Sequence, residues 1–471
     1  MSRKFEDRPV DSEPSRTTQG VMKRSNLLVS CLLCVGLGSA ACVVPIELVD
    51  DDGSTSSGEG TDSGDTTGSL DASDGTVDPS DTNGCAAGTP GCPCLPNSGC
   101  EAGHACADDE CVPLSGDCGN GMMDAGEDCD DGNLTDADGC NADCRLSGSV
   151  VWSLDYGDPI GTGRANSVAI DSTDAIVVGG SENVDFETRG WVRKLDRQGV
   201  EQWLDVLPVD VTNLEMATGP NDRIAAGCSE EGDFGFGSLW TRTYDTTGAI
   251  EQTIDEGWDM TQGIAINPTG IVLAGGSSRI YAYDGGPGWW WPLDGQIGAM
   301  TMTPAGSFFV VGRADESDAS WVASYGDSSA LGDPAWSQLG PDGFARGVAI
   351  DSMGNVIVAG NDLDLLAPAW LQKLAPDGSQ LWFTYLENSS GFEGLARGVA
   401  VDSHDRIVVV GDASTGFDTN AQISKLEADG EPLWTVEEQL GDANAVAIHS
   451  NDEIVVAGHL GLRIWVATYT P

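Results

Sequence analysis

The sequence has little positive charge. Its 471 residues include 22 Lys and Arg against 75 Asp and Glu, a formal net charge of −53, and neither Lys nor Arg occurs between Arg24 and Arg145. Such a chain repels phosphate backbones and anionic membrane surfaces. We therefore expect no nucleic acid partner, and the N-terminal third can attract only cations or basic surfaces.

Histidine is also scarce. The four histidines, His104, His404, His449 and His459, lie in different parts of the chain without metal-ligand spacing, and no nucleophile motif accompanies them. The sequence therefore predicts no catalytic residue and no defined metal site. His404 and His449 fall in expected turns and should be exposed to solvent, whereas we interpret Cys228 as a small buried apolar residue.

No apolar run is long enough to span a bilayer as a permanent helix. The stretch Leu27–Leu37 follows two basic residues and ends in small residues before Cys42, which is typical of an export signal. The ending Gly38-Ser-Ala-Ala-Cys42 resembles a bacterial lipoprotein signal, and this resemblance implies that Cys42 becomes the lipid-modified first residue. Ser39 departs from the usual Leu, and cleavage after Ala41 without lipidation is the alternative.

The first two segments of the chain are not expected to form a hydrophobic core. Residues 1–42 are the expected signal segment, with Met22 as an alternative start, and residues 43–84 are an expected linker. From Glu47 to Asn83 the linker has eleven acidic residues and no basic one. It cannot bury enough apolar surface to fold, and repulsion between its charges keeps it extended. We expect it to hold the folded parts away from an anchoring surface.

Cysteine is concentrated in residues 85–145, which contain almost no large apolar side chains. Disulfides must replace a core there. The number of cysteines is even, which supports an oxidising, extracytoplasmic location. The ten cysteines of this expected disulfide module are Cys85, Cys92, Cys94, Cys100, Cys106, Cys111, Cys118, Cys129, Cys140 and Cys144.

The end of this module carries a specific pattern. Cys118-Gly-Asn-Gly-Met-Met-Asp-Ala-Gly-Glu-Asp-Cys129, followed by Cys140 and Cys144, resembles the myxobacterial cysteine-rich repeat over residues 118–144. The resemblance implies two disulfides and an extracellular setting, without an activity. The six preceding cysteines resemble an EGF-like knot more loosely, and their pairing stays open. The acidic run from Asp128 to Asp138 lacks the Gly and the terminal Glu of an EF-hand.

An internal repeat dominates residues 149–471. Seven ungapped segments of thirteen residues each predict a strand, a tight turn and a second strand; they begin at Val168, Met216, Ile264, Met300, Val348, Val399 and Val446. Each repeat adds a third strand, an Asp-Gly type turn and a fourth strand, most often with a Trp. Four antiparallel strands in a period of about 47 residues are typical of a propeller blade. We therefore predict an all-β, seven-bladed β-propeller.

The ends of the repeat region predict how the ring closes. The last repeat stops at Tyr469-Thr-Pro471 after its third strand, and the missing fourth strand is Val150-Val-Trp152-Ser-Leu154 at the start. Pairing of these segments buries edges that an open array would expose. The repeats resemble the bacterial propeller repeats called SBBP and delta-60, and their Gly-then-Trp spacing is similar to quinoprotein-like repeats. These resemblances imply a fold and not an activity.

Candidate binding residues lie in the loops between second and third strands and between blades, which should share one face of the propeller. The carboxylates there are suited to calcium or a basic partner, or else form a solubilising surface. The Trp triplet offers a platform for a sugar ring, or else fills the core. The candidates are Asp185, Glu187, Glu230, Glu231, Asp233, Asp315, Glu316, Asp318, Asp362, Asp364, Asp412, Asp418, Trp289, Trp290 and Trp291.

The segments together predict a monomeric, non-enzymatic lipoprotein of the outer membrane or cell surface, whose propeller binds a surface protein or a glycan. Secretion without an anchor is the alternative location. No cofactor other than calcium is expected. Two other functions stay open. One is an extracytoplasmic enzyme, either a quinoprotein-like oxidoreductase or a carbohydrate-active lyase or hydrolase, and the other is a purely structural spacer.

Overall fold

The computed structural model describes thirteen stretches of the chain, and statements below concern these residues. They are 104–107, 110–113, 118–124, 126–157, 162–184, 187–207, 211–230, 238–285, 288–326, 332–363, 369–386, 394–414 and 418–471. The predicted signal segment with Cys42 and the predicted linker lie outside them. Within these stretches, no helix has the length and apolar character that crossing a membrane requires.

Seven four-stranded antiparallel sheets make up the propeller, so the predicted fold is confirmed. Blades 1 to 4 contain β4 (Thr162–Ile170), β5 (Ile176–Val184), β6 (Glu187–Leu195), β7 (Glu201–Val206); β8 (Val211–Thr218), β9 (Ile224–Glu230), β10 (Ser238–Tyr244), β11 (Ile250–Trp258); β12 (Gly263–Ile266), β13 (Val272–Gly275), β14 (Arg279–Tyr283), β15 (Trp289–Pro292); and β16 (Gly295–Met302), β17 (Phe308–Ala314), β18 (Ala319–Tyr325), β19 (Trp336–Asp342). Blades 5 to 7 contain β20 (Phe344–Ile350), β21 (Val356–Asn361), β22 (Ala369–Leu374), β23 (Gln380–Tyr385); β24 (Gly394–Val401), β25 (Ile407–Ser414), β26 (Thr419–Leu426), β27 (Pro432–Glu438); and β28 (Gly441–Ile448), β29 (Ile454–Leu460), β30 (Arg463–Tyr469), β3 (Val150–Tyr156). A 3-10 turn, η1 (Pro220–Asp222), joins β8 to β9.

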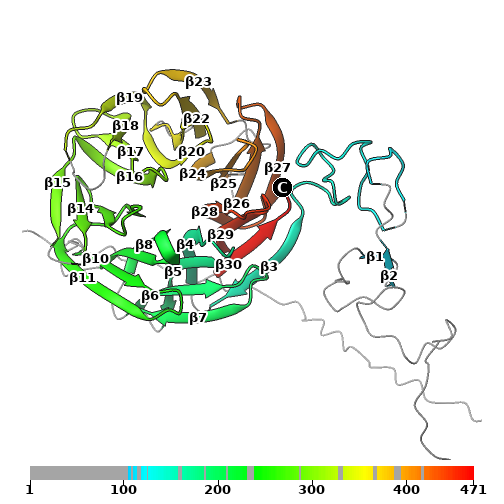
Figure 1. Cartoon of the computed structure of the whole chain (residues 1–471), viewed down its shortest axis with the longest axis horizontal. Coiled ribbons are helices and arrows are strands. Elements are labelled where there is room, and N and C mark those ends of the chain that lie inside the picture. Colours follow the sequence, from blue (N-terminus) through cyan, green and yellow to red (C-terminus); the bar gives the residue numbers. More distant parts are fainter. Residues whose placement is uncertain are drawn as a thin grey trace, which may run out of the picture. The chain divides into compact units, whose positions relative to one another are not determined.

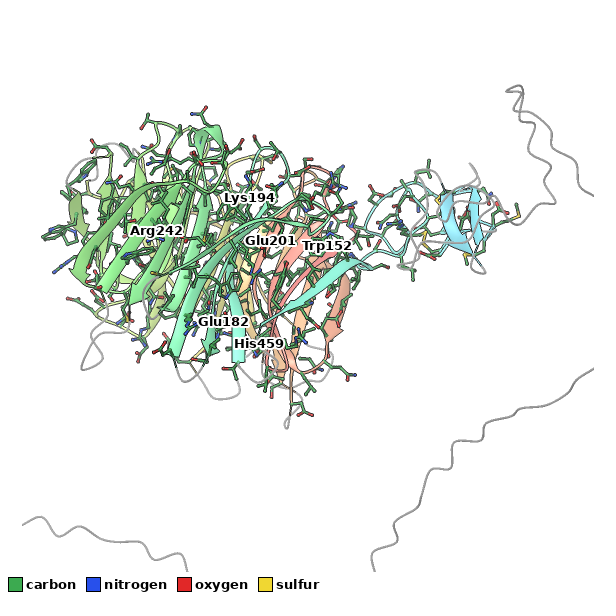
Figure 2. All side chains as sticks on the ribbon, turned by 90° about the horizontal axis from the view of Figure 1, so that it is seen from below. Trp152, Glu182, Lys194, Glu201, Arg242 and His459 are labelled. Atoms are coloured by element: carbon green, nitrogen blue, oxygen red, sulfur yellow. A yellow bond between two sulfur atoms is a disulfide. The ribbon has the colours of Figure 1, made fainter. Side chains whose placement is uncertain are left out.

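In each blade the first strand lies at the centre of the ring and the fourth at its rim (Figure 1). Because neighbouring strands are antiparallel, the first-to-second and third-to-fourth connections emerge on one side, which we call the turn face. The second-to-third and blade-to-blade connections emerge on the opposite side, the loop face. Figure 2 shows the disc edge-on, with Lys194 toward the turn face and Glu182 and His459 toward the loop face.

The ring closes as predicted. Strand β3 pairs with β30 in the register Trp152↔Thr468 and Leu154↔Val466, so the N-terminal strand supplies the rim of the last blade. Ser149 and Thr470 continue this contact through hydrogen bonds of 2.8 and 2.9 Å. No blade is therefore left with three strands.

The hydrophobic core is divided into seven clusters, one between each pair of neighbouring blades. Alternation along the second strands explains this division, because successive side chains point to opposite sides of a sheet. In β25, Ile407 and Val409 face blade 5, whereas Val408 and Val410 face blade 7. Each blade thus buries both of its faces against its neighbours, and this also holds where blade 7 meets blade 1.

The disulfide module precedes the propeller. Cys118 bonds to Cys144 and Cys129 to Cys140, so disulfides in this segment are confirmed and indicate an oxidising, extracytoplasmic environment. Strands β1 (His104–Ala107) and β2 (Glu110–Pro113) form a hairpin. The side chains of Cys106 and Cys111 are outside the described residues, as are four whole cysteines, Cys85, Cys92, Cys94 and Cys100.

Candidate functional site

On the turn face, serine and aspartate side chains tie neighbouring blades together. A Ser in one first-to-second turn donates through its hydroxyl and its backbone N–H to an Asp of the next blade. The hydroxyl-to-carboxylate distances are 2.6 to 2.9 Å, and the four pairs are Ser172–Asp222, Ser352–Asp405, Ser403–Asp452 and Ser450–Asp174. These carboxylates hold the ring together, so we assign them a structural role.

Three buried ion pairs lie beneath the same turns. The Lys Nζ atoms are 2.7 to 3.0 Å from the carboxylates in the pairs Lys194–Asp171, Lys373–Asp351 and Lys425–Asp402. Burial would raise the pKa of Asp171, but hydrogen bonds from Lys194, Thr173 and Ala175 outweigh it and hold that pKa below its usual range. These pairs are also structural.

One group near these turns has a composition suited to a metal. Ligand atoms of Asp402, His404 and Asp452 come within 4.8 Å of one another. Lys425 already pairs with Asp402, however, and Ser403 donates to Asp452. The arrangement is explained by blade packing, and we assign no metal to it. The His404 side chain is 60% exposed, as predicted.

His449 is buried, so the prediction that solvent surrounds it was wrong. It occupies the turn position of Asp171, Asp351 and Asp402, whose side chains point inward, and blade 7 has Thr468 in place of the paired Lys. Neither ring nitrogen has a hydrogen-bond partner, and Nδ1 lies 3.6 Å from Asp174 of blade 1. Burial lowers the pKa of His449, which Asp174 partly opposes.

The Gly-then-Trp spacing is explained by contacts between blades at the rim. The indole of a fourth-strand Trp lies over a turn glycine of the next blade, at a distance where an added Cβ atom would be 2.7 to 3.4 Å from the ring. The pairs are Trp152–Gly199, Trp203–Gly248, Trp336–Gly378, Trp382–Gly430 and Trp434–Gly148. The pattern needs no cofactor to account for it.

The predicted loop carboxylates do not converge. Among described residues, no three of them bring ligand atoms together, and Glu187 pairs with Arg189 at 3.4 Å. Exposed candidates are Glu187, Asp315, Glu316, Asp318 and Asp418, whereas Asp362 and Asp412 are partly buried. Asp185, Glu231, Asp233, Asp364 and the side chain of Glu230 lie outside the described residues.

The tryptophan triplet lies at the rim of blade 3 and not at the mouth of the central channel. Trp290 is 52% exposed and stacks beneath Arg279, whose Cζ is 4.7 Å from the ring centroid. Trp289 and Trp291 point to the opposite side of β15 and are partly buried. This placement follows from the alternation of successive side chains along a strand.

The polar residues at the channel mouth were not among the predicted candidates. In six of the seven first strands the pairing register shifts near the loop face, which marks a β-bulge. In five blades the extra residue of this bulge lines the central channel, as shown by Asn166, Gly298, Arg346, Arg397 and Asn444. The identical run Ala-Arg-Gly-Val-Ala at 345–349 and 396–400 is the signal that marks this position in a chain with few basic residues.

Arg397 pairs with two acidic side chains. Its Nε donates to Asp412 of its own blade at 2.8 Å, and Nη2 donates to Asp442 of blade 7 at 3.2 Å. Burial raises the pKa of Asp412, although Arg397 opposes this. Arg397 therefore joins blades 6 and 7 in the same way as Asn444, which donates to the Ala165 carbonyl of blade 1.

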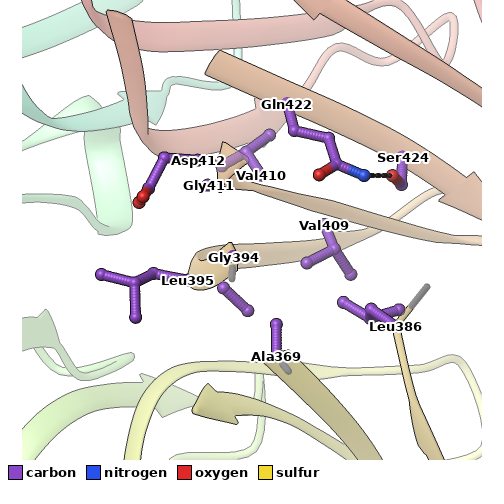
Figure 3. Close-up of a pocket in the computed structure, with 11 residues that line it drawn as sticks. Ala369, Leu386, Gly394, Leu395, Val409, Val410, Gly411, Asp412, Gln422 and Ser424 are labelled. Atoms are coloured by element: carbon purple, nitrogen blue, oxygen red, sulfur yellow. Dashed lines mark hydrogen bonds between the residues drawn. The ribbon is translucent and has the colours of Figure 1, made fainter. Parts of the chain in front are cut away.

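Arg346 occupies the equivalent position in blade 5 but has neither carboxylate. Asn361 stands in the place of Asp412 and accepts from Arg346 Nε at 2.8 Å. Leu395 of blade 6 stands in the place of Asp442. Figure 3 shows Leu395 and Asp412 pointing to the same side of blade 6, away from Gln422. Arg346 is exposed to the channel and forms no ion pair with a described carboxylate. Burial and the charge of Arg397 lower the pKa of Arg346, which Asp412 partly opposes.

Glu215 lines the same channel from blade 2. It stands where blades 5 and 6 have Gly347 and Gly398, and Asn213 donates to it at 3.3 Å. Burial raises the pKa of Glu215 to about 8. At neutral pH its carboxyl group is therefore protonated and can donate a hydrogen bond.

Two hollows result at the loop-face side of the ring. The channel segment with Arg346, Arg397 and Glu215 has a volume of about 230 Å³. A second hollow of about 450 Å³ lies between blades 7, 1 and 2, where Arg164 and His459 line it. The chemistry available in them is hydrogen bonding and charge pairing, and the described residues there include no serine or cysteine nucleophile held by a histidine.

Comparisons with known proteins identify no family. No family model matches the chain, and neither does any curated protein. Solved structures that it resembles include the WD40 β-propeller domain of Doa1, at 12% identity over 68% of this chain and 96% of that one, with a TM-score of 0.48. A catalytically inactive virginiamycin B lyase from Staphylococcus aureus with quinupristin has 9% identity over 67% and 99%, with a TM-score of 0.49. The Neurospora crassa Pan2 WD40 domain has 11% identity over 68% and 95%, with a TM-score of 0.49.

Proposed function

We propose that this chain is a non-enzymatic, extracytoplasmic binding protein, anchored to the cell surface through Cys42, whose propeller presents its loop face to a surface partner. The contrast between the two faces is the observation that carries the proposal. In the first-to-second turns of the turn face, six carboxylates are bound by Ser or Lys partners and have a structural role: Asp171, Asp222, Asp351, Asp402, Asp405 and Asp452. The loop-face hollows are lined by charged side chains such as Arg164 and Arg346, whereas the lining of the turn-face hollow of about 460 Å³ includes no charged residue.

The extracytoplasmic part of the proposal is supported by the two disulfides and by the signal-like N-terminus. The linker would then separate the propeller from the membrane. The partner class, a surface protein or a glycan, follows from the proposed location and from the polar side chains that line the loop-face hollows.

A pair of matched variants in blade 1 tests which face binds. Asn183→Arg adds a bulky cation to the loop face, where Asn183 lines the 450 Å³ hollow, and Gln198→Arg makes the same addition on the turn face. The full-length protein is immobilised, and retention of purified surface glycans and surface proteins is measured. We expect Asn183→Arg to weaken retention and Gln198→Arg to leave it unchanged. The reverse result, or no retention by the wild type, would contradict the proposal.

A further inference from the structure

Arg346 has the same position in blade 5 as Arg397 has in blade 6, but it lacks the two acidic partners through which Arg397 links neighbouring blades. The repeat supplies the reference geometry, because Arg397 in the next blade uses the same bulge to reach Asp412 and Asp442. At Arg346 these two places hold Asn361 and Leu395, so only Nε has a hydrogen-bond acceptor. The two terminal nitrogens carry four N–H groups, and they have no partner among the described residues.

An exposed guanidinium of this kind is suited to a carboxylate. Arg binds carboxylates through two parallel hydrogen bonds, which adds both energy and orientation. The Phe344 ring, 5.1 Å from Arg346 Cζ, and the Asn361 bond hold the side chain in place. Preorganisation of this kind lowers the entropic cost of binding.

The surroundings disfavour additional negative charge on the ligand. Asp412 and Asp442 flank the neighbouring Arg397 and would repel a second anionic group on the ligand. The net charge of −53 acts in the same direction. A polyanion such as a phosphorylated or sulfated polymer is therefore disfavoured.

The other walls of the channel favour hydroxyl groups. The Asn166 Oδ1 atom is buried without a hydrogen-bond partner, and Glu215 offers an acidic O–H across the channel. Hydroxyls match this mixture because they both donate and accept. The volume of about 230 Å³ is below the roughly 300–1,000 Å³ of drug-sized pockets and limits the bound group to about one sugar ring.

We infer that the channel mouth binds the carboxylate of a sugar acid through Arg346, with hydroxyl groups toward Asn166 and Glu215. This inference deepens the proposed function, on which it rests, because it names a ligand class for the loop face. A glycan bearing terminal uronate residues is the corresponding partner.

The test uses the full-length protein and small probes. Glucuronate, its uncharged amide, glucose, acetate and a short peptide with a free C-terminus are titrated by ligand-observed NMR and calorimetry. We expect glucuronate to bind, with the amide, glucose, acetate and the peptide weaker by roughly 10-fold or more, since each lacks either the charge or the hydroxyls. Absence of glucuronate binding, or tighter binding of the peptide or acetate, would overturn the inference.

Two variants act on Arg346 in opposite ways. Arg346→Gln removes the guanidinium, and Leu395→Asp keeps it but supplies the carboxylate that Asp442 provides to Arg397. Both should weaken glucuronate binding by roughly 10-fold or more. Arg189→Gln, at an exposed side chain of blade 1, is the matched control and should leave binding unchanged. If Arg346→Gln does not fold, Leu395→Asp and the titrations of the wild type with the probe series still test whether the channel binds a sugar acid.

Failure of the sugar-acid inference can be distinguished from failure of the proposed loop-face function. Loss of retention in Asn183→Arg together with unchanged glucuronate binding in Arg346→Gln and Leu395→Asp would overturn the sugar-acid site alone. Retention that depends on Gln198 and not on Asn183 would overturn the loop-face function itself.

Discussion

The indole of Trp434 lies on Gly148, where an added Cβ atom would come within 3.0 Å of the ring. In blade 7, Gly148 takes the place that Gly378 and Gly430 take in blades 5 and 6, although here the turn is divided between the two ends of the propeller. The same contact between a rim tryptophan and a turn glycine is therefore kept across the closure.

Replacing this glycine should weaken the closure. Gly148→Ala must adopt a φ of +73° and displace the indole, so we expect the free energy of unfolding to fall by roughly 1–3 kcal/mol. Gly461→Ala is the control, because its φ is +58° but no atom lies within 4 Å of the added Cβ. Urea denaturation of both variants measures the difference. Equal losses would show that the Trp434 contact contributes nothing.

Breaking a buried ion pair should lower the free energy of unfolding more than Gly148→Ala does. Lys425 and Asp402 are both completely buried, with Nζ 2.9 Å from the carboxylate. Lys425→Met leaves that carboxylate without a cation, and we expect a loss of about 3–5 kcal/mol in urea denaturation. The double variant Lys425→Met/Asp402→Asn should recover most of it, since Asn267 fills the equivalent turn of blade 3. No recovery would mean that packing, and not the stranded charge, dominates.

Mild acid should destabilise the ring through His449. Its folded-state pKa lies below its usual value because the imidazole is buried, so as pH falls through about 6.5 the unfolded chain binds a proton that the folded chain does not. The contribution of His449 to the free energy of unfolding therefore decreases with falling pH in that window. The difference in the free energy of unfolding between the wild type and His449→Asn should change accordingly between about pH 7.5 and 5.5, whereas His404→Asn, in the exposed turn of blade 6, should keep the wild-type dependence. A difference between the wild type and His449→Asn that does not vary with pH would contradict this assignment.

Glu215 should change the free energy of unfolding with pH in the direction opposite to His449. Burial raises its pKa from 4.5 to about 8, so between these values the folded chain holds a proton that the unfolded chain has lost. Stability therefore falls as pH rises through this window. We expect Glu215→Gln to unfold at a higher temperature than the wild type near pH 8 and at a similar temperature near pH 4. A constant difference at all pH values would point to packing instead.

The anchoring at Cys42 is testable in cells. Cys42→Ser removes the acceptor of the lipid, so labelling with an alkyne fatty acid should be lost and the protein should appear in the medium. Ser39→Leu, which brings the signal closer to the usual pattern, should keep both labelling and anchoring. Secretion of the wild type without label would favour cleavage after Ala41.

The fold was predictable because each blade repeats the same local chemistry. The thirteen-residue segments, the turn glycines and the unpaired third strand at Tyr469 together predicted seven blades and their closure by Trp152. The burial of His449 was missed because its position in a turn suggests exposure. The repeat alignment alone shows that it replaces an inward-pointing Asp.

The candidate site was only partly accessible to sequence reasoning. Loop carboxylates such as Asp412 stood out by composition, but the partner of Asp412 is decided by the bulge that turns Arg397 toward it. The same bulge leaves Arg346 without a carboxylate, because Leu395 of the neighbouring blade stands where Arg397 meets Asp442. The pattern within one repeat does not specify which side chain the neighbouring repeat supplies.

Strand β3 determines how the protein transmits force. The chain enters at Val150 on the turn face and runs to Tyr156 at the loop face, so tension from the N-terminal side pulls along this strand. Antiparallel hydrogen bonds lie across that direction and are loaded simultaneously rather than one after another. A pull on the chain N-terminal to the propeller thus loads the rim strand in its mechanically resistant direction.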